Sequence, residues 1–280
     1  MKSKVKTSIK FLSMLLIFAG LITSCSSDDD DASVSVKITD DPFPVQLVNE
    51  AKIGIAKVEL VDSEGNTVTV FNGNANVNMV NYMNGATAEV GVNAVPPGTY
   101  VEARVTLSEA SVTLSNQEQF EASVSTSHSY GVKIDPAIEV NEGEEAELLF
   151  DLDLSDTFKF QGNFLPGNWI QNVADITGLS SFEPDFRAVC LSKTGSIEGS
   201  VTNADGSVAA YAYCEVSYDY DGDGQRESVS TVADANGHFA IIGLPEGSYN
   251  VYVETGEGEA VSADVSVEVQ HAATVNVTIN

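Results

Sequence analysis

The stretch KIGIAKVEL, residues 52–60, alternates apolar and polar side chains over most of its length. A period of two places successive side chains on opposite faces of a β-strand, so one face of this segment should be buried and the other exposed. No long amphipathic helical pattern follows residue 25. The sequence therefore predicts an all-β protein built from antiparallel β-sandwiches. Comparable alternation recurs at residues 33–38, 101–107, 146–154 and 274–279.

Turn sequences separate these strand patterns. DSEGN at 62–66, NADG at 203–206 and DANG at 234–237 each combine Asp or Asn with Gly. These residue types tolerate a positive φ angle, which tight hairpin connections require. Each of the three segments is therefore predicted to be a hairpin connection.

One short motif occurs twice, as VPPGTYVE at 95–102 and as LPEGSYNV at 244–251. Proline and glycine force a tight corner before the tyrosine begins a strand. There its ring can cap the core while its hydroxyl reaches a backbone acceptor. The two copies indicate two related sandwiches, and we predict one over residues 33–188 and another over 194–280.

Residues 1–24 have the pattern of a secretory signal peptide, with a basic start and an apolar run at 11–22. That run is about a dozen residues, whereas a membrane-spanning helix needs roughly 20. The segment LITSC at 21–25 resembles the lipobox of bacterial lipoproteins, which implies that Cys25 becomes the first mature residue and carries acyl chains such as palmitate. The alternative is an ordinary signal peptide in which Cys25 is incidental.

The segment SSDDDD at 26–31 follows this cysteine directly. Four consecutive carboxylates cannot pack into a core, so residues 25–32 are predicted to form a solvated tether. The tract also resembles the acidic surface-export signal of some Gram-negative lipoproteins. We therefore predict a lipid anchor in the outer membrane with the protein facing the cell exterior, and a periplasm-facing site is the alternative.

The chain is strongly acidic. Its formal charge of −28 becomes −32 once the four lysines of residues 1–24 are removed. Phosphate backbones would repel such a protein, so the composition argues against a nucleic-acid partner. High charge favours solubility at an exposed surface. The alternative explanation of the acidic composition is a requirement for divalent cations.

Two segments resemble known families. GSIEGSV at 195–201, DANGHFAI at 234–241 and LPEGSY at 244–249 occur in the order typical of the carboxypeptidase regulatory-like domain. That resemblance implies a seven-stranded, transthyretin-like (prealbumin-like) sandwich and a non-catalytic accessory module, often grouped with carbohydrate-binding-like folds. VSVKITDDP at 34–42 and LFDLD at 149–153 are similar to a lipoprotein domain family of unknown function, which supplies architecture and no mechanism.

An acidic insertion at 219–227, DYDGDGQRE, resembles the first part of a calcium loop. Hard Ca²⁺ binds six to eight oxygen ligands from a tightly turned backbone. Ser230 stands where a complete helix-flanked loop has a bidentate glutamate. The alternatives are a shorter calcium-binding hairpin loop and a solvated hairpin tip. The candidate ligands are Asp219, Asp221, Asp223, Gln225 and Glu227.

A second candidate site is the aromatic segment FKFQGNFLPGNW at 158–169. The rings of Phe160, Phe164 and Trp169 could stack on sugar rings while nearby Asn and Gln side chains bind hydroxyls. The alternative is a loop that folds back and closes the end of a sandwich.

Cys190 and Cys214 are the thiols that remain after lipidation. In an oxidising compartment they could form a disulfide, with stabilisation of about 3 kcal/mol in the chain-entropy model. Two buried, unpaired cysteines are the alternative.

No nucleophile elbow, zinc-protease motif or phosphate-binding glycine loop occurs in the sequence. We therefore expect a non-enzymatic, lipid-anchored surface protein that displays β-sandwich modules for binding or scaffolding. The alternative function is the carbohydrate-binding component of a surface polysaccharide-capture system. The expected partners are the membrane, through the lipid, and a glycan or another surface protein; Ca²⁺ is the one cofactor considered.

Overall fold

The computed structural model describes residues 32–41, 47–162, 173–219, 226–255 and 260–279. Within these ranges the chain is almost entirely β-strand, and the helices are single short turns. The all-β prediction is confirmed. The helical turns are η1 (Met79–Asn81), α1 (Leu154–Thr157), η2 (Val173–Asp175) and η3 (Leu191–Lys193).

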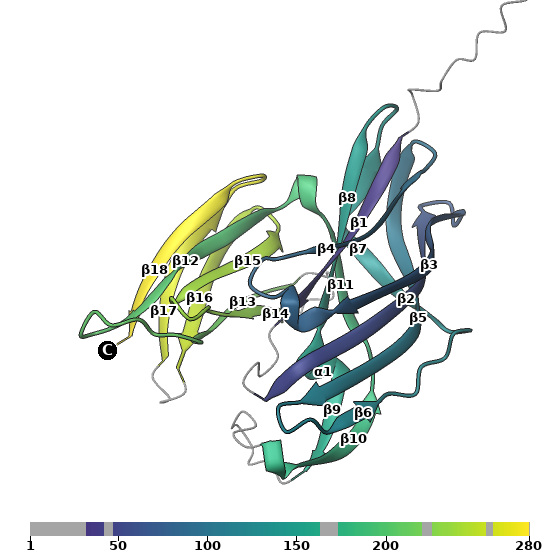
Figure 1. The fold of residues 1–280 in the computed structure, drawn as a ribbon. Coiled ribbons are helices and arrows are strands. Elements are labelled where there is room, and N and C mark those ends of the chain that lie inside the picture. Colours follow the sequence, from purple (N-terminus) through teal and green to yellow (C-terminus); the bar gives the residue numbers. More distant parts are fainter. Residues whose placement is uncertain (1–31, 42–46, 163–172, 220–225, 256–259, 280) are drawn as a thin grey trace, which may run out of the picture.

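Strands β1 to β11 form the first sandwich, drawn in purple to green in Figure 1. Their order in the main sheet is β3-β2-β5-β7-β11-β8-β1-β4, with β6 paired to β5, while β9 and β10 pair separately. The bounds are β1 Ser33–Asp41, β2 Val48–Asp62, β3 Thr67–Asn78, β4 Ala88–Ala94, β5 Gly98–Leu114, β6 Gln119–Glu121, β7 Ser129–Val140, β8 Glu145–Asp153, β9 Phe158–Gly162, β10 Ile176–Phe182 and β11 Asp185–Cys190.

Strand β2 contains the alternating stretch 52–60, and its apolar side chains face the core. Ile53, Ile55, Val58 and Leu60 are completely buried. The alternation shifts by one residue after Ile55, where the pairing with β3 and β5 changes register. Such an extra residue is a β-bulge, which bends the strand while returning the next apolar side chain to the core.

Strands β12 to β18 form the second sandwich, which has the seven strands expected from the family resemblance. A three-stranded sheet, β15-β12-β18, packs on a four-stranded sheet, β14-β13-β16-β17. The bounds are β12 Gly195–Asn203, β13 Tyr213–Tyr218, β14 Glu227–Val232, β15 His238–Leu244, β16 Gly247–Glu254, β17 Ala260–Val267 and β18 Ala272–Ile279.

Most strand pairs are antiparallel, as predicted, but three pairs are parallel. These pairs are β1 with β8, β7 with β11, and β12 with β18. Parallel neighbours cannot be joined by a hairpin and need a long connection, so each pair brings together segments that are distant in the sequence. Strand β1 therefore lies next to β8 although about a hundred residues separate them.

Each sandwich has its own hydrophobic core. One core is built from buried side chains between Ala32 and Cys190, and the other from buried side chains between Ile197 and Ile279. The two copies of the proline-glycine-tyrosine motif occupy equivalent corners of these cores. The hydroxyls of Tyr100 and Tyr249 donate hydrogen bonds to the carbonyl oxygens of Pro96 and Pro245, each over 2.7 Å. The predicted backbone acceptor is thus found in both copies.

Candidate functional site

The most elaborate polar arrangement in the described residues lies where the two sandwiches meet. Arg187, on β11 of the first sandwich, points into this junction and is almost completely buried. Its guanidinium donates to the carboxylate of Asp151, which lies opposite on β8. A buried arginine requires such a partner, because removing a charge from water costs several kcal/mol.

The same guanidinium reaches across to the second sandwich. It donates to the carbonyl oxygens of Gly243 at 2.7 Å and Ile242 at 3.1 Å, both on β15. It also donates to the hydroxyl of Tyr218 on β13 at 3.1 Å. Arginine presents several donors in a rigid plane, so one side chain can hold groups from two elements of the partner sandwich.

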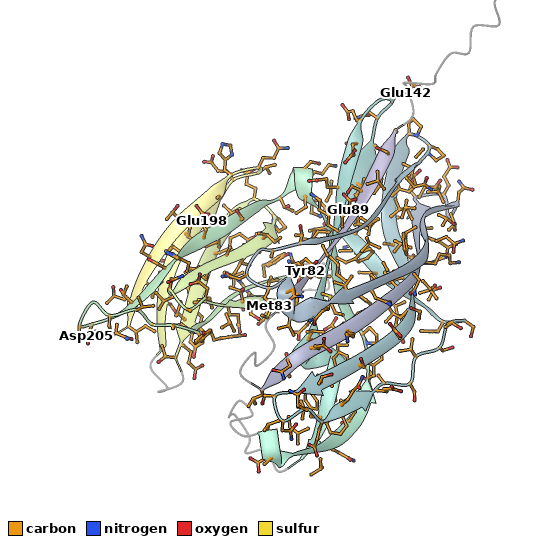
Figure 2. All side chains as sticks on the ribbon, in the orientation of Figure 1. Tyr82, Met83, Glu89, Glu142, Glu198 and Asp205 are labelled. Atoms are coloured by element: carbon orange, nitrogen blue, oxygen red, sulfur yellow. The ribbon has the colours of Figure 1, made fainter. Side chains whose placement is uncertain are left out.

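Asn84 forms a second polar link between the sandwiches. Its amide nitrogen donates to the carbonyl oxygen of His238 at 3.0 Å, and its amide oxygen accepts from the backbone nitrogen of Ala240 at 2.6 Å. Both partners belong to β15, an edge strand of its sheet. The side chain therefore satisfies backbone groups that a neighbouring strand would otherwise pair, and it covers part of an exposed edge. Figure 2 labels Tyr82 and Met83, just before Asn84, on the side of the first sandwich that faces the second.

Glycines allow the two surfaces to approach closely. A β-carbon on Gly85 would lie 3.0 Å from the side chain of Ala240, and one on Gly243 would lie 2.9 Å from that of Val189. Both glycines also have positive φ angles, of 77° and 71°. The junction is therefore closely packed as well as hydrogen-bonded.

The junction is a region of low solvent access. Burial raises the pKa of the Tyr218 hydroxyl, although the neighbouring Arg187 guanidinium acts in the opposite direction. A cavity of about 10 Å³ lies beside Asp40, Asp151 and Thr231, with room for a single water-sized molecule. Such surroundings strengthen the electrostatic interaction between Arg187 and Asp151 and make the loss of either partner costly.

The predicted calcium loop falls largely outside the described residues. Asp221, Asp223 and Gln225 lie in 220–225, and the side chain of Glu227 is likewise undescribed. Asp219, at the end of β13, is exposed. Among the residues the structure does describe, no three His, Cys, Asp or Glu side chains gather as metal ligands would. Calcium binding by this loop stays a prediction.

The predicted aromatic site is described only at Phe160. This side chain, on β9, is half-buried and packs against the core of the first sandwich. Phe164 and Trp169 lie in 163–172, outside the described residues. Cys25, the predicted lipidation site, lies in 1–31, also outside them.

Cys190 and Cys214 are free thiols in the structure, so of the two alternatives the unpaired one is found. Cys190 belongs to the core of the first sandwich and Cys214 to that of the second. Side chains that fill two different cores cannot approach to disulfide distance.

Burial raises the pKa of the Cys214 thiol to about 12. Because the thiolate is the reactive form, this cysteine should be almost inert to iodoacetamide in the folded protein at pH 8. Mass spectrometry of the unreduced soluble chain should find Cys214 unmodified when folded and both thiols modified in denaturant. Two thiols that stay unmodified in denaturant until a reductant is added would show a disulfide instead.

Sequence analysis missed the junction. Asp151 falls within the motif LFDLD at 149–153, which indicated a family resemblance only, and neither Arg187 nor Asn84 belongs to a predicted site. A charged residue inside an otherwise apolar strand, as in DFRAVC at 185–190, was the available signal. Such a residue is rarely buried without a partner.

In the described residues no helix is long and apolar enough to cross a bilayer.

Comparison with known proteins agrees with the two-part organisation. Residues 31–165 match the family described as "Domain of unknown function (DUF4382)", and residues 196–280 match "Carboxypeptidase regulatory-like domain". No curated protein sequence matches this chain.

Several solved structures show a distant similarity to this chain. A "putative carbohydrate binding protein" from Pseudomonas aeruginosa is 18% identical, with 31% of this chain and 90% of that chain covered and a TM-score of 0.23. The major pilin subunit of Bacillus cereus is 11% identical, with 89% and 69% covered and a TM-score of 0.25. The minor pilin of Streptococcus agalactiae is 12% identical, with 88% and 94% covered and a TM-score of 0.25.

Similarity at this level assigns no fold, ligand or partner to this chain. The family matches allow a more specific statement. The first part of the chain, residues 31–165, is similar to the DUF4382 family, and the second part, residues 196–280, is similar to the carboxypeptidase regulatory-like domain.

Proposed function

We propose that this protein is a lipid-anchored, non-catalytic surface protein that holds two β-sandwiches as one rigid arm outside the cell. The observation that carries the proposal is the junction, where the buried Arg187 guanidinium binds four groups from both sandwiches. A flexible linker would leave each domain to move separately, whereas a hydrogen-bonded and closely packed junction fixes their relative orientation. Rigid display suits a scaffold or a binding module that must project from a membrane.

The sequence supplies the rest of the proposal. Cys25 would hold the acyl chains, and SSDDDD at 26–31 would extend the arm away from the membrane. One acyl chain binds a membrane only marginally, so stable anchoring requires more than one. The net charge of −32 after removal of residues 1–24 would keep neighbouring copies and anionic headgroups apart.

The anchor can be tested with Cys25→Ala in the full chain, expressed in the native host with an alkyne-labelled palmitate. We expect the wild-type protein to carry the label, to fractionate with the outer membrane and to bind antibody on intact cells. Cys25→Ala should carry no label and appear in the soluble fraction. Cys190→Ala is the matched control, because a buried core thiol should not affect labelling.

The acidic tract is tested separately by replacing the four aspartates at 28–31 with asparagine. We expect this variant to keep the lipid and to lose antibody binding on intact cells. Unchanged antibody binding would contradict a role of the tract in surface export, and it would not affect the proposal of a lipid anchor. A wild-type protein without label would contradict the anchored arm itself.

A second candidate function is binding of a carbohydrate by the displayed arm. The observation that favours it is an exposed tyrosine in the second sandwich, Tyr211, which is 48% exposed in a loop between two strands. Aromatic rings held at a surface are common contacts for sugar rings. Trp169, the ring predicted from the sequence, lies outside the described residues.

A further inference from the structure

Two apolar side chains are exposed together in the loop between β12 and β13. Val208 and Tyr211 are each 48% exposed, and in the described part of the chain Val92 is the other large apolar side chain with comparable exposure. The loop lies at the end of the second sandwich away from the first, where Figure 2 labels Asp205. Exposed apolar side chains that gather in one loop mark a contact surface more often than isolated ones do.

The backbone of Tyr211 is in an unfavourable conformation. Its φ angle is +59°, in the left-handed region that glycine and asparagine adopt readily and a bulky aromatic residue rarely does. The chain is fixed before and after it, because Ala209, two residues earlier, and Ala212, the next residue, are buried. The Ala209 nitrogen donates to Val201 at 3.1 Å, and the Ala212 carbonyl accepts from Ala233 at 2.8 Å. The surrounding structure thus holds the ring outward at a local cost, as is typical of functional sites.

A polar turn lies directly beside this pair. The backbone nitrogen of Tyr211 faces the carbonyl oxygen of Asp234 at 3.5 Å. A β-carbon on Gly237 would lie 3.1 Å from the side chain of Val208. The same turn exposes Asn236, whose backbone nitrogen donates to the Asp234 carboxylate at 2.7 Å. The loop that carries Tyr211 and the turn that carries Asp234 and Asn236 are therefore neighbours on the surface.

We propose that Tyr211 is the stacking platform of a binding site for a neutral glycan, with the turn at 234–237 contacting the sugar hydroxyls. This proposal rests on the second candidate function and names its site. An aromatic face fits the C–H face of a sugar ring, and carboxylate and amide groups bind its hydroxyls. The net charge of −32 after removal of residues 1–24 disfavours an anionic polysaccharide. Two side chains are too small a patch for a stable protein interface, which buries about 800 Å² per partner.

The site is tested with the soluble chain from Ser26 onward on a printed array of neutral and anionic oligosaccharides, followed by titration of the best neutral binder. We expect the wild-type chain and Tyr211→Phe to bind alike, because phenylalanine keeps the ring. Tyr211→Ala should weaken binding by about tenfold or more. Trp169→Ala should bind like the wild type.

Three results would overturn the proposal. They are silence of the wild-type chain on every neutral glycan, full binding by Tyr211→Ala, and loss of binding in Trp169→Ala alone. The last result would assign glycan binding to the aromatic loop instead. None of them concerns the lipid anchor, so the labelling experiment on Cys25 separates failure of this site from failure of the displayed arm.

The unfolding temperature of Tyr211→Asn is a second measurement, and it distinguishes a tyrosine kept for binding from one that only stabilises the loop. Asparagine accepts the left-handed conformation, so this variant should unfold at a temperature about 2 °C higher than the wild type while its binding is lost. A lower unfolding temperature would show that the ring stabilises the loop by packing, and the argument from strain would then fail.

Discussion

Replacing Arg187 with methionine should lower the free energy of unfolding by about 3–5 kcal/mol. The Asp151 carboxylate is 6% exposed and would keep its charge without the guanidinium that neutralises it. The carbonyl oxygens of Ile242 and Gly243 would lose a donor as well. Urea denaturation followed by circular dichroism measures the change.

Two further variants make this result specific. Arg104→Met removes an ion pair with Glu102 in which the side chains are 42% and 37% exposed. Exposed pairs contribute about 0–1 kcal/mol, so this control should change stability little. Combining Arg187→Met with Asp151→Leu should recover part of the loss, because a buried ion pair replaced by apolar side chains is often neutral. If Arg187→Met lowers the free energy of unfolding no more than Arg104→Met does, the stabilising role of the buried ion pair between Arg187 and Asp151 is contradicted.

Replacing Gly199 with alanine should have a comparably large effect, with a loss of at least about 3 kcal/mol, at the upper end of overpacking. Gly199 lies in β12, the central strand of its sheet, opposite Val275 of β18. A β-carbon there would lie 1.6 Å from the Val275 carbonyl oxygen and 3.0 Å from the Phe239 ring. Backbone on one side and a core ring on the other leave no direction in which the strand can relax without breaking its pairing.

Thermal denaturation compared with Gly98→Ala tests this expectation. Gly98 begins β5 in the first sandwich, and a β-carbon on it would meet nothing within 4 Å. That control should be close to neutral. A Gly199→Ala protein as stable as the Gly98→Ala control would mean that β12 and β18 are not paired as closely as described.

Local features of the fold could be predicted because they depend on neighbouring residues. The alternating strands, the turns with Asp, Asn and Gly, and the two tyrosine corners all follow from side chains within a few positions of one another. The prediction of seven strands in the second sandwich followed from a family resemblance, which three motifs in the expected order indicated. The bulge in β2 was not predicted, although the apolar alternation shifts by one residue between Ile55 and Val58.

The junction could not be predicted, because its partners are far apart in the sequence. Arg187 lies 36 residues from Asp151 and 56 from Gly243, and the parallel pairing of β1 with β8 joins segments still more distant. Tyr211 was missed for another reason: left-handed backbone is predicted from glycine or asparagine, and a tyrosine gives no such signal. The predictions at Cys25, Trp169 and the loop 219–227 stand as predictions.

The central claim is that Arg187 and Asn84 join the two sandwiches into one rigid body, and a distance distribution between spin labels tests it most directly. One label replaces Glu142 in the first sandwich and the other replaces Ala204, beside Asp205 in the second; both positions are exposed. Cys190 and Cys214 are buried and should be spared by the label. Pulsed electron paramagnetic resonance on the soluble chain should give one narrow distance distribution. The distribution should broaden in the double variant that combines Arg187→Met with Asn84→Ala. A broad distribution in the wild-type chain would contradict the claim.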